Sequence, residues 1–146
     1  MKPASFLALL MSSLAQPAVG AEGQAVEPVE MAGSCRTAGI GRAFLDNAKA
    51  QALAPPECDR AVAIGSASLS FFRSGDTSPQ LLFSGRGGTG RSFDVEIVRI
   101  GDGPVLNVIS GNCLRNTFFI TCHAIFDEGG VRKGIAVSFD LKRDRR

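Results

Sequence analysis

From residue 61 onward the chain consists of short apolar runs separated by turn-forming residues, and this pattern restricts the fold more than any other feature. Runs that alternate between apolar and polar residues are typical of strands with one buried face. The candidate strands cover residues 61–73, 81–83, 92–100, 105–112, 118–126 and 131–139. About six antiparallel strands in succession predict a mainly β domain, borderline α+β. A meander sheet and a small barrel both remain open, because the pattern does not choose between them.

The last two candidate strands form the best-defined hairpin. With Glu128-Gly129 as a two-residue turn, Phe126 faces Val131, and the same register sets Phe118 opposite Phe139. Nearly all residues paired in this way are apolar, and a one-residue slip would reverse their faces. In the preceding hairpin, a turn at Asp102-Gly103 sets Ile100 opposite Val105.

One helix is expected ahead of the strands, at about 40–53, packed on the sheet. Ile40, Phe44, Ala48 and Ala52 recur at four-residue spacing, and Pro55-Pro56 ends the pattern. Residues 22–34 have no useful periodicity and are interpreted as a flexible arm. A single domain is therefore expected over 35–142, followed by a basic tail at 143–146.

Residues 1–21 are typical of an export signal. Lys2 supplies the positive charge, the run Phe6–Met11 is a short apolar core, and Val19-Gly20-Ala21 provides small residues before Glu22. The core is far shorter than the roughly 20 apolar residues of a membrane span. We therefore expect a periplasmic or secreted protein that is cleaved near Ala21-Glu22 and does not insert into a membrane.

The chain has four cysteines, all beyond the expected cleavage site. Disulfides persist in the compartments that exported proteins reach. Of the three possible pairings, Cys35–Cys58 and Cys113–Cys122 close short loops and are favoured. The second pairing centres its hairpin on Thr117-Phe118, which is poor turn chemistry, so a bulge or an irregular loop is expected there. A zinc site or a redox pair would need a Cys-x-x-Cys spacing, which the chain lacks, so no metal is expected.

The run 85–90 (Gly-Arg-Gly-Gly-Thr-Gly) matches the pattern G-x-G-x-x-G. A dinucleotide site needs a helix after this pattern, whereas a strand is expected here, so the chain predicts no nucleotide cofactor. A spacer loop between strands is the plain interpretation. The functional one is a binding loop in which Arg86, Gly87, Gly88 and Arg91 hold a carboxylate or phosphate, because two guanidinium groups flank flexible backbone N–H donors.

Catalytic patterns are weak. His123 is the only histidine, and no serine lies in a Gly-x-Ser-x-Gly setting. Asp94 and Glu96 share one strand face, as paired carboxylates of a glycosidase could, but the chain has neither Trp nor Tyr to stack on a sugar. The polar face of a strand is the simpler interpretation of His123, Asp94 and Glu96.

The formal net charge is only +2, which gives no reason to expect nucleic acid as a partner. The favoured hypothesis is a small exported, non-enzymatic binding module of the cell envelope. It would hold a protein or a small anionic ligand through loops at one end of the sheet. A structural or assembly subunit of an envelope complex and a small hydrolase that uses His123 are the alternatives.

Overall fold

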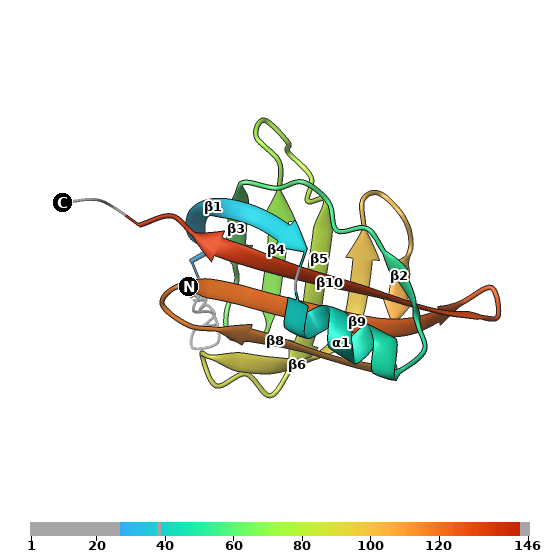
Figure 1. Cartoon of the computed structure of the whole chain (residues 1–146). Helices are drawn as coiled ribbons and strands as arrows, with labels where there is room; N and C mark the ends of the chain where they lie inside the picture. Colours follow the sequence, from blue (N-terminus) through green and yellow to red (C-terminus); the bar gives the residue numbers. More distant parts are fainter. Residues whose placement is uncertain (1–26, 38, 144–146) are drawn as a thin grey trace, which may run out of the picture.

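The computed structural model describes residues 27–37 and 39–143, which form a closed antiparallel barrel of eight strands (Figure 1). The first and last strands close it, because Cys35 of β1 lies opposite Phe139 of β10. Of the two arrangements that the strand pattern left open, a meander sheet and a small barrel, the structure has the barrel. Its strands in spatial order are β1 Val29–Thr37, β3 Arg60–Ala63, β4 Ser68–Phe72, β5 Leu81–Arg86, β6 Ser92–Ile100, β8 Ser110–Arg115, β9 Phe119–Glu128 and β10 Val131–Leu141.

Two further short strands extend the barrel wall. Strand β7, Val105–Asn107, continues the pairing of β6, and β2, Gln51–Leu53, runs parallel to β10. The expectation of about six strands was too low for two reasons. The expected strand 61–73 is two strands joined by a turn in which Gly65 has a positive φ of 67°. The expected arm also contributes a strand, since Val29–Thr37 is β1.

The expected arm 22–34 is thus corrected for residues 29–34, which are part of the barrel. The first part of β1, residues 29–32, pairs with β3, and the second part, residues 33–37, pairs with β10. The sequence signal was weak because, of the inward-facing positions Met31, Gly33 and Cys35, only Met31 is a large apolar residue. The expected signal peptide at 1–21, residues 22–26 of the arm and residues 144–146 of the tail lie outside the described residues.

The hairpin of β9 and β10 has a different register from the predicted one. Phe126 lies opposite Lys133 rather than Val131, and Phe139 lies opposite Ile120 rather than Phe118. The turn is Gly129-Gly130, whose φ angles of 59° and 79° are the two positive values that a type I′ turn requires. The slip is two residues, so every side chain keeps its predicted face.

The preceding hairpin is shifted as well. Arg99, not Ile100, lies opposite Val105, because the loop includes Gly101 as a third residue with a positive φ of 56°. The expected strand 105–112 is divided into β7 and β8 at Val108 and Ile109. The amide of Val108 still donates to Glu96, whereas the amide of Ile109 donates to Ile125 of β9.

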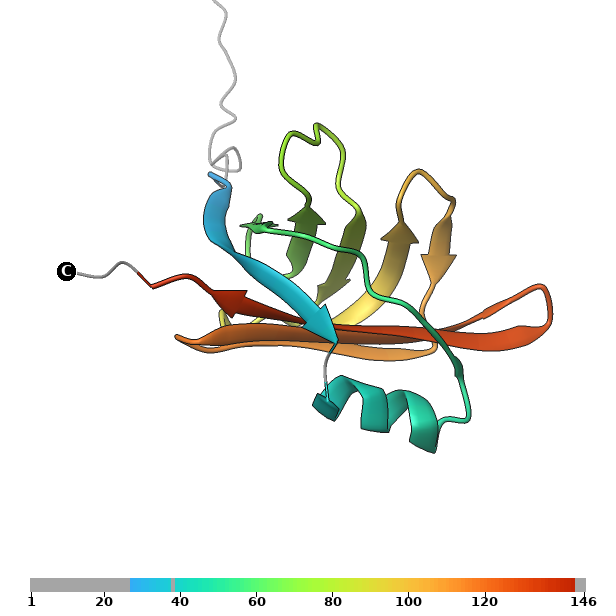
Figure 2. The same cartoon turned by 45° about the horizontal axis from the view of Figure 1, so that its top comes forward.

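Helix α1, Gly39–Asn47, is shorter than the expected 40–53 and lies outside the β9–β10 hairpin (Figure 2). It ends because Lys49 adopts a left-handed conformation with φ 56°. The amides of Lys49 and Ala50 then donate to the carbonyls of Asp46 and Leu45, which is a Schellman motif. The chain beyond it becomes β2. Leu45, 1% exposed, packs the helix onto Ile125 and Ala136.

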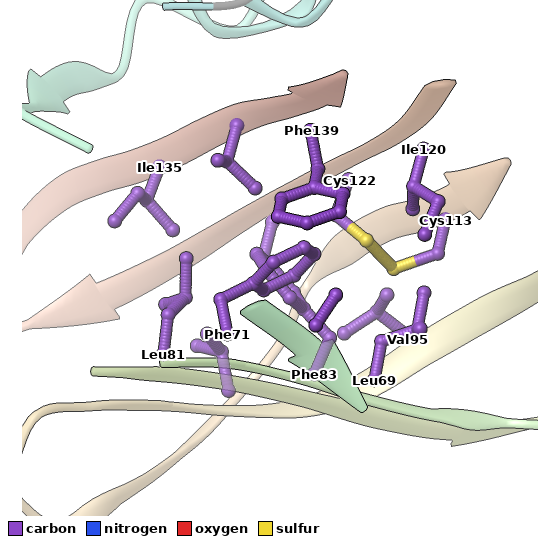
Figure 3. Packing of buried hydrophobic residues seen from close by; sticks show 14 of the residues in the cluster. Leu69, Phe71, Leu81, Phe83, Val95, Cys113, Ile120, Cys122, Ile135 and Phe139 are labelled. Atoms are coloured by element: carbon purple, nitrogen blue, oxygen red, sulfur yellow. A yellow bond between two sulfur atoms is a disulfide. The ribbon is translucent and has the colours of Figure 1, made fainter. Parts of the chain in front are cut away.

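The interior of the barrel is filled with side chains (Figure 3). Phe71, Phe83, Phe126 and Phe139 are fully buried, and the Phe71 ring meets those of Phe83 and Phe139 at centroid distances of 6.1 and 5.8 Å. Burial of each large ring contributes about 2–3 kcal/mol relative to leaving it exposed. The middle of the barrel is therefore a packed core.

Both favoured disulfides are present. Cys35–Cys58 ties β1 to the segment before β3, and Cys113–Cys122 joins β8 to β9 at directly opposed positions, with Cα–Cα distances of 5.0 and 4.1 Å. Of the bulge or irregular loop expected beside the second pair, no bulge is present, because the register runs without interruption to Arg115 opposite Ile120. Asn116 stabilises the turn instead, since its Oδ1 accepts hydrogen bonds from the amides of Phe118 and Phe119 at 2.7 and 2.9 Å. Disulfides indicate an oxidising, non-cytoplasmic environment.

Candidate functional site at the barrel mouth

One end of the barrel carries the turns β3–β4, β5–β6 and β8–β9, because every second turn of an antiparallel barrel lies at the same end. A pocket of about 150 Å³ opens there, which we call the mouth pocket. Leu69 and Phe93, 4% and 6% exposed, form its apolar inner part together with Ala63. Its lining nearer the surface includes Ser66, Ser68 and Ser92, which are exposed or half-buried.

Two arginines complete the lining of the mouth pocket. Arg91 lies at the start of β6 and is exposed, and Arg115 lies at the end of β8 and is half-buried. The backbones of the two residues are in contact, because the amide of Arg115 donates to the carbonyl of Arg91 at 2.6 Å. Within the described residues, neither guanidinium has a carboxylate within 4.0 Å, whereas most of the other arginines do.

A second, larger pocket of about 500 Å³ is also lined by these arginines, and we call it the outer groove. Gly90, Arg91 and Arg115 line both spaces, so they form a shared wall. The remaining lining consists of Met31 and Leu141, which are apolar, and Asn116 and Thr117, which are polar. The described linings of the two pockets contain no carboxylate and no histidine.

Further positive charge lies close to the outer groove. The backbone amide of Leu141, which lines the groove, donates to Phe118 of the β8–β9 turn, and the guanidinium of Arg143 lies 4.3 Å from the Phe118 ring centroid. Lys142 follows Leu141 and donates its amide to Ala32. Neither Lys142 nor Arg143 is within 4.0 Å of a described carboxylate. This end of the barrel therefore carries four cationic residues, which are Arg91, Arg115, Lys142 and Arg143.

The structure separates the predicted binding residues. Gly88 is packed against the β3–β4 turn, and a Cβ atom there would overlap the backbone of Ser66. This contact requires glycine and holds the loop beside the mouth pocket. Gly87, with φ 75°, has open space around it. Arg91 lines the pocket, whereas Arg86 does not.

Arg86 points to a different partner. Its guanidinium makes two hydrogen bonds with the carboxylate of Glu96 on the neighbouring strand β6. These bonds raise the pKa of Arg86 and lower the pKa of Glu96, so both groups stay charged. Both side chains are exposed, so the pair contributes little to stability. The pair does neutralise the charge of Arg86. Of the two arginines predicted to bind an anion, Arg91 is therefore the one that lines a pocket.

Arg115 is the site residue that sequence reasoning missed. It follows Cys113 by two residues and lies at the end of β8. The strand pairing Phe93 opposite Cys113, together with Cys113 opposite Cys122, brings Arg115 beside Arg91. The β6–β8 pairing could have identified Arg115. The sequence does not show this pairing, because a break at Val108 and Ile109 divides the expected strand into β7 and β8.

His123 lies on the outer wall of the barrel, away from the mouth. Its ring stacks on Phe44 of α1, with centroids 4.3 Å apart and an interplanar angle of 1°. Burial under the helix lowers the pKa of His123 and favours its neutral form. No carboxylate or hydroxyl of the described residues makes a hydrogen bond to it. The ring thus serves as packing surface for the helix.

Among the described residues no group of three His, Cys, Asp or Glu side chains is placed to hold a metal ion. No described helix is long and apolar enough to cross a bilayer. Comparison of the chain with family models, with curated proteins and with solved structures gave no match.

Proposed function

We propose that this protein is a small exported binding module of the cell envelope, without enzymatic activity, that holds an anionic ligand at the mouth of its barrel. The ligand is a small molecule or the anionic part of a protein. One observation carries the proposal: Arg91 and Arg115 stand side by side on a pocket wall with no described carboxylate to neutralise them.

Two adjacent like charges repel each other, and a bound anion relieves this repulsion. A guanidinium donates through a planar fork that matches the two oxygens of a carboxylate, and such charge-assisted bonds are the stronger ones. The lining of the same pocket includes Ser66, Ser68 and Ser92, and serine hydroxyl groups donate hydrogen bonds to anions. The closed barrel supports this arrangement on a rigid wall, where binding loops are commonly carried.

Nuclear magnetic resonance titration of ¹⁵N-labelled protein with acetate and with inorganic phosphate tests the proposal. We expect saturable shifts of the backbone amides of residues 88–92 and 113–117. The variant carrying Arg91→Gln and Arg115→Gln should lose these shifts and keep its thermal stability, because neither side chain has a described carboxylate partner.

Arg86→Gln is the matched control, since Arg86 belongs to the same loop region but is held by Glu96. It should bind both anions as the wild type does. Equal loss of binding in the Arg86 variant and in the double variant would place the site elsewhere on the loop. Absence of saturable shifts in the wild type would contradict the proposed function.

A further inference from the structure

The mouth pocket and the outer groove meet only at the wall formed by Gly90, Arg91 and Arg115. A mainly apolar pocket and a larger, mixed groove therefore share the two arginines as lining residues. A ligand that uses all three features has an apolar group, a negative charge beside it and a further extension. This inference rests on the proposed function and narrows its ligand.

The last residue of a peptide has these three parts attached to one carbon atom. Its Cα carries the side chain, the free carboxylate and the amide nitrogen that leads to the rest of the chain. From the shared wall we propose that the barrel mouth binds the C-terminal residue of a peptide or protein. The side chain enters the mouth pocket, the carboxylate meets Arg91 and Arg115, and the preceding residues lie in the outer groove.

The size and lining of the mouth pocket indicate the class of side chain. Its volume of about 150 Å³ is close to that of an engineered apolar cavity that binds benzene. Leu69 and Phe93 offer apolar surface at its inner part, and no charged group lies there. A phenylalanine, leucine or isoleucine side chain fits this description, whereas a charged or a very small side chain does not.

The outer groove suits a peptide backbone. The Oδ1 atom of Asn116 already accepts two hydrogen bonds from its own turn, which leaves its Nδ2 group to donate to a peptide carbonyl. Thr117 adds an exposed hydroxyl, and Met31 and Leu141 supply apolar contact. A small acid would fill the mouth pocket and leave this groove unused. Inorganic phosphate would use the arginines alone.

Isothermal titration calorimetry with three probes tests the inference. The probes are the peptide N-acetyl-Gly-Gly-Phe with a free carboxylate, the same peptide with a C-terminal amide, and 3-phenylpropionate. We expect the free-acid peptide to bind at least tenfold more tightly than its amide, because the amide lacks the charge-assisted bonds to the arginines. We expect 3-phenylpropionate to bind more weakly than the free-acid peptide by a similar factor.

Protein variants test two of the three contacts, those of the carboxylate and of the outer groove. The double variant Arg91→Gln, Arg115→Gln should bind the acid and the amide peptides equally, and Thr117→Ala should weaken only the peptides. Arg132→Gln is the control, since Arg132 pairs with Asp127 near the opposite end of the barrel. It should change nothing, and thermal unfolding of each variant confirms that it is folded.

The outcomes separate the two proposals. If 3-phenylpropionate binds as tightly as the free-acid peptide, the outer groove is not used and the inference is wrong, while the proposed function stands. If the amide peptide binds as tightly as the acid, the inference is also wrong. If no carboxylate binds and the nuclear magnetic resonance titrations show no anion site, both proposals are wrong.

Discussion

Lys49 ends helix α1 in a left-handed conformation and is the only described residue other than glycine with a positive φ. An L-residue in this conformation costs about 1–2 kcal/mol, because its Cβ approaches the following carbonyl oxygen. The Schellman hydrogen bonds of Lys49 and Ala50 and the packing of Leu45 compensate for this cost. At the scale of the residue, the surrounding contacts therefore hold Lys49 in a backbone conformation that a lysine disfavours.

We predict that Lys49→Gly raises the free energy of unfolding by about 0.5–1 kcal/mol. Glycine adopts the conformation without a penalty, although it also gains freedom in the unfolded chain. Ala43→Gly, at an exposed position inside the same helix, should instead lower stability by about 1 kcal/mol. Urea unfolding of both variants measures the difference, and a loss of stability in Lys49→Gly would refute the strain argument.

At the scale of the element, α1 is held to the barrel wall by a small apolar contact and by one aromatic stack. Leu45 packs on Ile125 and Ala136, and a Cβ at Gly134 would overlap the Leu45 side chain. Beside this contact, Phe44 covers His123. The attachment is thus sensitive to the charge of one ring, because a protonated imidazole under the helix loses part of its hydration.

This arrangement predicts that part of the stability of the protein depends on pH. Burial lowers the pKa of His123 below its unfolded value of about 6.5, so the folded state binds fewer protons than the unfolded state. The contribution of His123 is therefore complete above pH about 6.5 and is lost as the pH falls through the lower, folded pKa.

Urea unfolding at pH 7.5 and at pH 5.0 measures this loss, and His123→Leu provides the comparison. The wild type should lose more stability than the variant on acidification, because the other titrating groups are common to both proteins. Hydrogen exchange of the α1 amides should also speed up more in the wild type. Equal acid sensitivity of the two proteins would mean that burial of His123 does not govern its protonation.

At the scale of the whole molecule, the two disulfides connect different parts of the barrel. Cys35–Cys58 ties β1, the strand that closes the barrel, to the segment before β3, across 23 positions of sequence. Cys113–Cys122 spans nine positions within a hairpin that its strand pairing already holds. The longer closed loop restricts the unfolded chain more, so the first bond is expected to contribute more stability.

We predict that Cys35→Ala with Cys58→Ala lowers the free energy of unfolding by about 3 kcal/mol, and that Cys113→Ala with Cys122→Ala lowers it by somewhat less. The second pair differs in another way, since Cys113 lines the mouth pocket and Cys35 and Cys58 do not. Ligand titration should therefore detect the second change and not the first. Equal effects of both variants on binding would contradict the placement of the pocket.

The sequence indicated much of this organisation, and the errors have physical causes. The mainly β class, the outer helix and both disulfides follow from periodicity and loop length, which are local properties. Closure of the barrel depends on β1, whose inward-facing positions Met31, Gly33 and Cys35 include only one large apolar residue. The pairing of Arg91 with Arg115 depends on β6 meeting β8 across an interrupted strand. Such contacts between distant segments cannot be derived from one local pattern.

The two-residue difference between the predicted and the observed register of the β9–β10 hairpin also concerns how the chain reaches its native state. Both registers keep the same faces buried, so the predicted pairing is close in energy to the native one and competes with it during folding. The slipped turn would force Glu128 into a positive φ, at a cost of about 1–2 kcal/mol, whereas Gly129 and Gly130 adopt theirs freely. The diglycine thus biases the search toward one of two nearly equivalent alignments, and its replacement by bulkier residues would slow refolding by populating the other.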